Sequence, residues 1–222
     1  MKIELIDVAG FWPAIWGMRN PLGSHHLMDS EQPEEAEYEV YSEDEDDSGE
    51  GGWGLPKGFR FGPNDHKLAM KLANAGNDHG KFLRQIVVWA DVTATQTFFS
   101  QLDTYRMGVE KNSTSKMHTL MKNKITPAMF DMSAWEGESS WQYEDIFDQC
   151  EELRQAGEFD KLLSILPMSF LQTRTCMISY AALRNIYHAR RNHKLKEWHT
   201  FCDWIETLPY SELITGEEKD GN

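Results

Sequence analysis

The stretch QTFFSQLDTYRMGVEKNSTSKMH, residues 96–118, is the part of this chain that decides its fold. Its first half places Phe98, Leu102 and Tyr105 at helical spacing, so these apolar side chains share one side of a helix. We therefore predict an amphipathic helix that ends at Gly108, because glycine is the residue most often found just past a helix.

A polar run, residues 110–115, follows this helix and precedes a second short helical run at residues 116–121. A loop rich in Asn, Ser and Thr that opens a helix can bind an anion, because the first backbone N–H groups are unpaired and the helix dipole favours negative charge. Serine and threonine also occur at such positions simply because they cap helices. The sequence leaves both interpretations open.

Apolar periodicity and turn residues predict the other elements. Strands are expected at residues 2–8 and 85–92. Helices or helical turns are expected from a cap at Asn64 or Asp65 to Gly76, and at residues 79–84, 143–156, 162–166, 170–191 and 196–208. The one at residues 170–191 is predicted to be the longest, and the one at residues 143–156 to turn Ile146, Cys150 and Leu153 inward.

The net charge of −14 comes mostly from one segment. Residues 29–50 hold twelve acidic residues and no Lys or Arg, which leaves a balance of −2 for the rest of the chain. Such a segment is typical of a solvated, flexible insertion, and the alternative is an arm that faces a protein partner or mimics DNA. A generally basic surface for nucleic acid is absent from the sequence.

Cysteine spacing and hydropathy exclude several classes of protein. Cys150, Cys176 and Cys202 are far apart and form no CxxC pair, so neither a zinc knuckle nor a disulfide framework is indicated. The histidines near the C-terminus lack i,i+4 spacing, and we expect no metal site. No apolar run approaches membrane-spanning length and no signal peptide is recognisable, so we expect a cytoplasmic protein.

The helix predicted at residues 170–191 carries an informative stripe. Tyr180, Leu183, Tyr187 and Arg190 recur at three- and four-residue spacing, and Arg191 follows directly. Guanidinium groups at this end either complement the helix dipole or bind an anion such as phosphate, whose oxygens match the planar donor fork of arginine.

Residues 105–118 resemble the flavin-dependent thymidylate synthase family, whose motif has the form RHRxxSxNExSxRY. Asn112 and Ser115 match the motif in place, and Arg106 falls on its histidine. The order and approximate spacing of the elements are similar from about residue 65 to residue 205.

Two further segments are similar to this family. Residues 77–80 and the strand after them look like the family's turn and strand, with Arg84 where the family carries a histidine. Residues 166–167, before the predicted long helix, look like the late segment in which an arginine helps to bind the nucleotide. Arg191 fits that arginine best, and Arg190 is the neighbouring choice.

The chain also departs from the family's pattern. The changed motif positions are Tyr105 and Met107 for two arginines, Glu110 for a serine, Ser113 for the glutamate, and Met117 and His118 for the final Arg-Tyr. The lost arginines remove charge that a phosphate needs, and an acid at the motif's serine position would oppose its binding. The cations available to compensate are Arg19, Lys116, Arg174 and Arg184.

The resemblance implies an α/β (α+β) fold, a mixed sheet flanked by helices with a long C-terminal helix pair, in a homotetramer whose sites lie between subunits. It implies that the chain binds a dUMP-like nucleotide and FAD, with a folate and NADPH as co-substrates, for reductive methylation of dUMP to dTMP. The nucleotide contacts that it implies are Arg106, Asn112, Ser113, Ser115, Arg190 and Arg191. The residues implied for flavin contact or proton handling are His79, Arg84 and His118, and no catalytic residue is assigned.

Two alternatives stay open. A non-catalytic descendant would bind a nucleotide or a protein, with residues 29–50 as its partner-facing arm; the loss of the motif arginines favours it, and the retained Asn-Ser-x-Ser turn argues for a remaining ligand. In an enzyme with altered chemistry, Glu110 would act as a new acid or base. For domains, we expect residues 1–28 and 54–210 to form one body, residues 29–53 an insertion, and residues 211–222 a polar tail.

Overall fold

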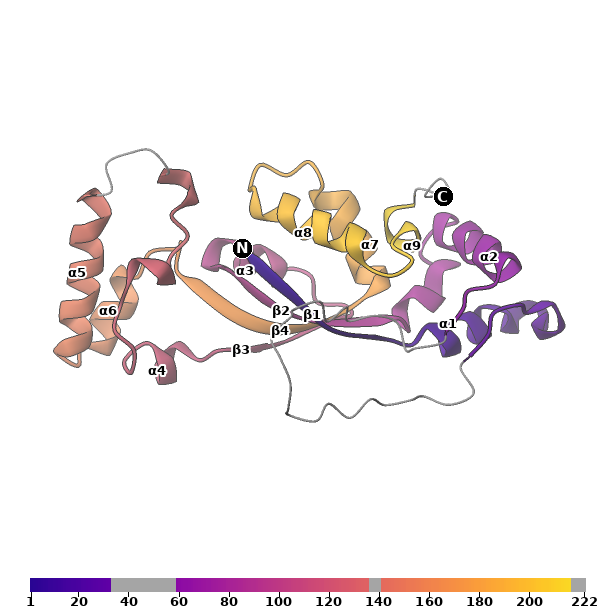
Figure 1. Cartoon of the computed structure of the whole chain (residues 1–222), viewed down its shortest axis with the longest axis horizontal. Coiled ribbons are helices and arrows are strands. Elements are labelled where there is room, and N and C mark those ends of the chain that lie inside the picture. The colour runs from indigo at the N-terminus through magenta and orange to yellow at the C-terminus, as the bar shows by residue number, and fades with distance from the viewer. Residues whose placement is uncertain (33–58, 136–140, 217–222) are drawn as a thin grey trace, which may run out of the picture. The chain divides into compact units, whose positions relative to one another are not determined.

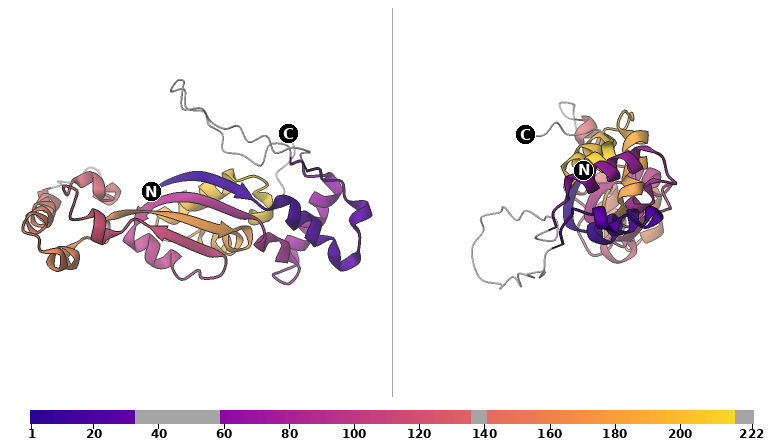
Figure 2. Two further views of the ribbon diagram at one scale, coloured as in Figure 1. Left: turned by 90° about the horizontal axis from the view of Figure 1, so that it is seen from below. Right: turned by 90° about the vertical axis from the view of Figure 1, so that its right-hand side faces the viewer.

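The computed structural model describes residues 1–32, 59–135 and 141–216. In this part of the chain a sheet of four strands has the order β1-β2-β4-β3 (Figures 1 and 2). The strands are β1 Lys2–Ala9, β2 Val87–Thr95, β3 Val109–Ser113 and β4 Leu171–Ser179. Helices accompany the sheet, so the predicted mixed sheet flanked by helices is confirmed.

Strand β2 shows why its sequence forms a strand. Its side chains alternate between a face that is buried and a face that is half-buried. The buried face consists of Val88, Ala90, Val92 and Ala94, each at most 1% exposed. This period of two is the pattern of a strand with one side in the core, and the predicted strand at residues 85–92 is confirmed.

The helix predicted at residues 170–191 is wrong in its first half. Leu171–Ser179 is strand β4, and helix α7 covers only Tyr180–Arg190. The segment before the helix contains three β-branched residues, which favour a strand, and Ser179 caps the helix by accepting a hydrogen bond from the amide of Ala182 at 3.2 Å.

The polar loop predicted at residues 110–115 is also wrong, because most of it is strand β3. This strand lies at the edge of the sheet beside β4. Val109 is buried and Lys111 is half-buried, whereas Glu110 and Asn112 between and beyond them are exposed. A polar sequence is tolerated in a strand at a sheet edge, where one side of the strand faces solvent.

The chain packs as two compact units. The first comprises Met1–Glu4, Asp91–Arg106 and Lys111–Cys176, and the second comprises Leu5–Ala90, Met107–Glu110 and Met177–Asn222. In the first unit the helices are α3 Gln96–Leu102, α4 Lys116–Thr119, α5 Trp141–Gln155 and α6 Phe159–Ile165, with 3-10 turns η4 Pro127–Met129 and η5 Ser133–Trp135. In the second they are α1 Phe11–Met18, α2 Pro63–Asn74, α7, α8 Glu197–Thr207 and α9 Glu212–Thr215, with 3-10 turns η1 Asn20–Leu22, η2 His25–Leu27 and η3 Gly80–Arg84.

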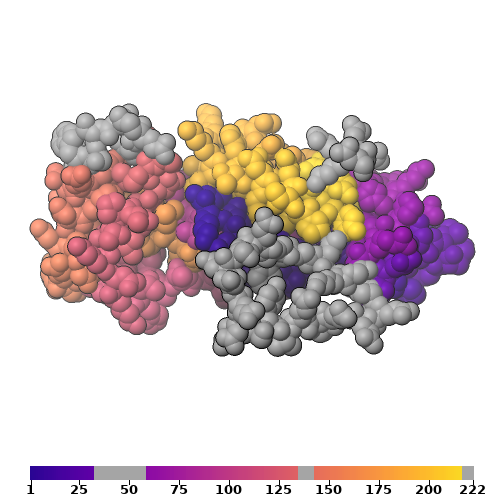
Figure 3. Space-filling model, in the orientation of Figure 1, coloured from indigo at the N-terminus to yellow at the C-terminus, as the bar shows by residue number. Residues whose placement is uncertain are grey.

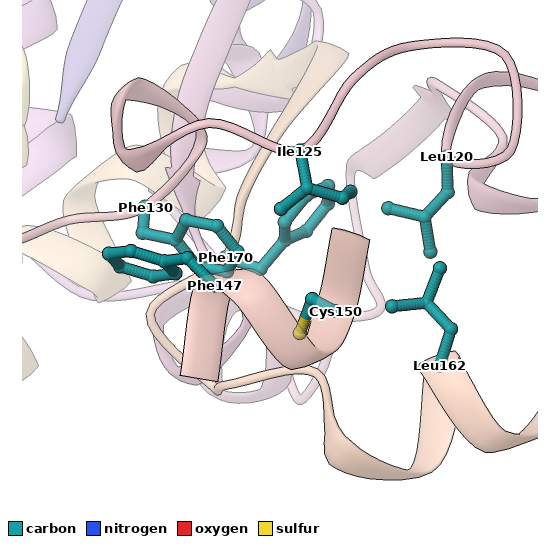
Figure 4. Packing of buried hydrophobic residues seen from close by; sticks show 7 residues of the cluster. All are labelled: Leu120, Ile125, Phe130, Phe147, Cys150, Leu162 and Phe170. Carbon is teal, nitrogen blue, oxygen red and sulfur yellow. The ribbon is translucent and has the colours of Figure 1, made fainter. Parts of the chain in front are cut away.

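The first unit has its own apolar core, in which α5 and α6 pack together (Figures 1 and 4). The core residues are Leu120, Ile125, Phe130, Phe147, Cys150, Leu162 and Phe170. Phe130 stacks on Phe147 with ring centroids 4.5 Å apart. Ile146 and Leu153 pack against this core beside Cys150, as the periodicity of the helix predicted. Each fully buried apolar side chain stabilises the fold by about 1.5–3 kcal/mol.

The second unit is built around the C-terminal helix pair, α7 and α8, and this predicted pair is confirmed. Helix α7 packs against α8, α9 and η3, and α9 also contacts α2 (purple beside yellow in Figure 3). Trp198, Phe201 and Tyr180 are fully buried there. We expected a polar tail from residue 211, but Leu213 and Ile214 of α9 are also fully buried. Residues 217–222 lie outside the described residues.

A buried ion pair holds the start of helix α2 in place. Arg19 Nε donates to Asp65 Oδ1 at 2.5 Å, and the two side chains are 4% and 0% exposed. The other oxygen of Asp65 accepts hydrogen bonds from the amides of Ser30 and Asp29 at 2.8 and 3.0 Å. The predicted cap was wrong: Asp29 accepts from the amides of Asn64 and Asp65 instead. Asp29 and Ser30, at the start of the acidic segment that we expected to be flexible, are therefore hydrogen-bonded to the start of α2. Residues 33–58 lie outside the described part of the chain.

We expect Gly108→Ala to destabilise the protein by about 1–3 kcal/mol. Gly108 has φ +72°, and an added Cβ would lie 2.4 Å from the hydroxyl of Ser179, which caps α7. Urea unfolding followed by circular dichroism measures this loss. The control is Ala156→Gly, which exchanges alanine and glycine at an exposed position of the first unit. A Gly108→Ala protein as stable as the parent would contradict the close packing of this turn.

Candidate functional site

Charged side chains of α4, of strands β3 and β4 and of the residue after α3 gather in the first unit. Asp103, just after α3, accepts from Lys111 Nζ at 2.9 Å and from Arg174 Nη1 at 3.1 Å. Lys116, at the start of α4, donates to the side-chain oxygen of Gln96 at 2.9 Å. We call Asp103, Lys111, Lys116 and Arg174 the basic cluster.

Several contacts fix Arg174 in this cluster. Its guanidinium carbon lies 4.0 Å from the ring centroid of Phe99 on α3, which is a cation–π geometry. Its Nε donates to Gln172 Oε1 at 3.2 Å, and the amide nitrogen of Gln172 donates to the carbonyl of Thr114 at 2.5 Å. Because Thr114 connects β3 to α4, the same network ties the strand that bears Arg174 to the helix that bears Lys116.

The basic cluster carries an excess of positive charge, since Lys111 and Arg174 share the carboxylate of Asp103 and Lys116 donates to a neutral amide. The side chains of Arg174 and Lys111 are only 14% and 16% exposed. Burial and, secondly, the charge of Arg174 lower the pKa of Lys116. Keeping cations together away from water costs free energy unless an anion compensates them. The cluster is therefore suited to bind an anion.

The residues predicted from the motif surround this cluster along the chain. Asn112 and Ser113 are exposed on β3, next to Lys111. Ser115 stands at the cap position of α4, but its hydroxyl makes no capping hydrogen bond. His118 is exposed on α4, and Arg106 is exposed between α3 and β3. Asn112, Ser113, Ser115 and His118 thus lie in the same segment, residues 111–118, as Lys111 and Lys116 of the basic cluster.

The two predicted arginines of the second unit lie at the end of α7. Arg191 forms ion pairs with Asp203 and, at 3.2 Å, with Glu206 on α8. Arg190 lies over the ring of Trp198 with its guanidinium carbon 5.0 Å from the centroid. A phosphate would have to compete with two carboxylates for Arg191.

The predicted flavin contacts of the second unit flank the turn η3. His79 precedes it and lines a cavity of about 560 Å³ between this turn, α2 and the end of α1. Arg84 ends the turn and lines a smaller cavity of about 120 Å³ together with Arg184. Both His79 and Arg84 are exposed.

The structure separates the four cations that the sequence offered as replacements for the motif arginines. Lys116 and Arg174 join the basic cluster. Arg19 pairs with Asp65, and Arg184 donates to the main-chain carbonyls of α9, so these two hold the fold together. Two of the four are therefore available to a ligand.

Comparison with known proteins places the fold. No family model matches the chain, and no curated protein matches it. A structure of flavin-dependent thymidylate synthase ThyX from Helicobacter pylori complexed with FAD and dUMP has 16% identity and a TM-score of 0.66, over 97% of this chain and 98% of that one. A second such complex has 15% identity, a TM-score of 0.67 and the same coverage. The UMP/dUMP methylase PolB from Streptomyces cacaoi, bound with 5-Br dUMP, has 15% identity and a TM-score of 0.63, over 96% of this chain and 94% of that one.

The chain has the ThyX fold. On this fold, the segment that resembles the ThyX motif is strand β3 with the start of α4. Lys111 lies within that segment and was missed by the sequence reasoning, because a loop gives no reason to single out one side chain. Reading residues 109–113 as a strand would have put Lys111 on the same face as the buried Val109.

We also searched the described part of this ThyX fold for metal ligands, reactive thiols and membrane-spanning helices. Residues 1–32, 59–135 and 141–216 contain no group of three or more His, Cys, Asp or Glu side chains that could hold a metal ion. The three cysteines are buried and unpaired, and burial raises the pKa of Cys176 and Cys202 to about 11, which keeps these thiols protonated. In the same residues no helix is both long and apolar enough to cross a bilayer.

Acid should weaken the basic cluster through Asp103. Burial raises the pKa of Asp103, but hydrogen bonding to Lys111 and the charge of Arg174 outweigh burial and hold it below its ordinary value. The ion pairs therefore stabilise the fold above the unfolded pKa of about 3.9, and this stabilisation is lost as the pH falls through the lower, folded value. The Asp103→Asn variant should therefore lose less stability than the parent protein when the pH falls from about 5 to about 2. Urea titrations at several pH values measure this loss of stability. The control is Asp145→Asn, which changes an exposed carboxylate on α5. Parallel pH profiles for the parent and Asp103→Asn would refute the prediction.

Proposed function

We propose that this chain binds a phosphorylated pyrimidine nucleotide of the dUMP type, with the phosphate held by the basic cluster. The observation that carries this proposal is the charge imbalance in the cluster, where Lys111 and Arg174 share the carboxylate of Asp103 and Lys116 donates to the uncharged side chain of Gln96. The cluster lies in the segment that resembles the ThyX motif, and the similar solved structures contain dUMP or a brominated dUMP.

Each group has a role in this proposal. Arg174 donates to a phosphate oxygen from the guanidinium nitrogen that does not contact Asp103 or Gln172, and the lysines act as point charges beside it. The short polar side chains of Asn112, Ser113 and Ser115 donate further hydrogen bonds. We also propose Arg106, Arg190 and Arg191 as nucleotide contacts, in a homo-oligomer, a tetramer by resemblance, whose subunits share each site.

The finer proposal is a flavoenzyme. FAD would be contacted by His79, Arg84 and His118, and a surplus of cations also suits its pyrophosphate. Bound FAD supplies the electrons that reductive methylation of dUMP to dTMP requires, with a folate as carbon donor and NADPH as reductant. The chain's own residues would bind and orient the nucleotide and neutralise its phosphate, in a cytoplasmic protein.

A second candidate function is a nucleotide-binding module without catalysis. The specific observation that favours it is the pairing of Arg191 with Asp203 and Glu206, since the arginine that the resemblance assigns to the nucleotide is already neutralised. Tyr105 and Met107, at two arginine positions of the motif, point the same way.

The visible absorption spectrum separates these candidates. The protein is incubated with FAD, with and without dUMP, and desalted before measurement. We expect flavin bands to be retained and to be stronger when dUMP is present. If the protein is colourless but still binds dUMP, only the non-catalytic nucleotide-binding module remains. A protein that binds neither FAD nor dUMP would rule out both candidates.

A further inference from the structure

The cavity of about 560 Å³ in the second unit has no role in the proposed phosphate site. Its walls are the end of α1 with the turn η1, one side of α2, and the turn η3. The lining includes Gly17, Asn20, Leu72, Asp78, Lys81 and Gln85. A volume of this size falls within the range of about 300–1,000 Å³ that small-molecule sites in proteins occupy.

The walls of this cavity are fixed to one another, so the cavity is formed before any ligand arrives. The buried pair of Arg19 and Asp65 joins the end of α1 to α2. At the other end of α1, Gly10 lies so close to η3 that an added Cβ would be 2.0 Å from the carbonyl oxygen of Gln85. A preformed site loses little entropy when a ligand binds.

A missing side chain creates part of the space. Gly17 lies in helix α1 at the cavity wall, and a Cβ added there would touch only the side-chain amide of Gln85, at 3.7 and 3.8 Å. A larger residue at position 17 would thus enter the cavity without striking the backbone.

The lining determines what the cavity can hold. Most of its surface is apolar, from the side chains of Met18, Pro21, Leu22, Leu68, Leu72 and Phe82. The lining holds one carboxylate, Asp78, and one lysine, Lys81, so a phosphate group would find no surplus of lysine or arginine there. The side-chain amides of Asn20 and Gln85 make no hydrogen bond to other residues in the described ranges, which leaves them available to orient a ligand.

We propose that this cavity binds an uncharged and largely apolar small molecule, oriented by hydrogen bonds from the amides of Asn20 and Gln85. This site lies in a different unit from the basic cluster, and it goes beyond the proposed nucleotide function. Its ligand is recognised by shape and apolar contact, as is usual for pockets with few polar groups. A phosphate group would find only one lysine and one carboxylate in this lining, so phosphorylated nucleotides are not the ligands proposed for it.

The test uses the neutral fluorescent probe N-phenyl-1-naphthylamine, which brightens when it leaves water, and the full-length protein. We expect saturable binding of one probe per chain, unaffected by dUMP or FAD. Gly17→Leu should fill the space and lower the affinity at least about tenfold, which corresponds to about 1.4 kcal/mol. Leu72→Phe, which adds bulk from α2 instead of α1, should have the same effect if Gly17→Leu does not fold.

The control is Asn185→Leu, which adds the same side chain to an exposed position on α7 of the same unit. It should leave probe binding unchanged. Unchanged affinity in both cavity-filling variants would overturn the inference. Displacement of the probe by FAD would also overturn it, since it would make the cavity part of the flavin site. A failure of the nucleotide proposal shows as an absence of dUMP binding and leaves the probe result intact.

Discussion

Asp65→Ala should lower the free energy of unfolding by about 3–5 kcal/mol, because it leaves the charge of Arg19 buried without an opposite charge beside it. Asp65 is 0% exposed, and it accepts hydrogen bonds from Arg19 and from the amides of Asp29 and Ser30. All of these donors would be left unsatisfied inside the protein. A loss of this size is a large fraction of the stability of an ordinary domain, about 5–15 kcal/mol, so the variant should unfold at much lower urea concentration.

The control for this variant is Asp78→Ala, which removes an exposed carboxylate of the same unit and should change stability by no more than about 0.5 kcal/mol. A double variant, Arg19→Met with Asp65→Leu, should recover much of the loss, because no buried charge then lacks a partner. If Asp65→Ala costs less than about 1 kcal/mol, the pair is not the buried junction that the structure shows.

Lys116→Ala should weaken the binding of dUMP about ten- to a hundredfold. A hydrogen bond to a charged group contributes about 1.5–3 kcal/mol, and the lysine is one of three cations that the proposal assigns to the phosphate. Its nitrogen now bonds only the side-chain oxygen of Gln96 in the described part of the chain, so its removal does little to the fold.

Isothermal titration calorimetry with dUMP measures this effect, and Lys124→Ala is the matched control. Lys124 is an exposed lysine of the same unit that lies outside the basic cluster, so its replacement should leave the affinity unchanged. Equal affinities for the parent, Lys116→Ala and Lys124→Ala would remove Lys116 from the site. A loss of affinity in both variants would indicate a general charge effect instead of a specific contact.

The parts of the fold that could be predicted are those whose periodicity is local. Strand β2 alternates between buried and half-buried residues, and helix α5 repeats its apolar residues at helical spacing, so both are visible in sequence. The boundary between β4 and α7 was not visible, because apolar residues continue across it and the only local signal is the cap at Ser179. Strand β3 was missed because its polar sequence is acceptable only at the edge of a sheet, which is a property of the whole fold.

The candidate site was predictable to a similar extent. The segment with Asn112 and Ser115 could be recognised from its polar residues and its resemblance to the ThyX motif. Its partner Arg174 comes from β4, far along the chain, and no local pattern reports that it reaches Asp103. The same limit applies to Arg191, whose carboxylate partners belong to the next helix.

Isothermal titration calorimetry of dUMP against deoxyuridine tests the proposed function most directly, because the two ligands differ only in the phosphate. The basic cluster predicts that dUMP binds and that deoxyuridine binds at least about a hundredfold more weakly, a difference of about 2.7 kcal/mol. Equal affinities, or no binding of dUMP at all, would contradict a phosphate site at Lys111, Lys116 and Arg174.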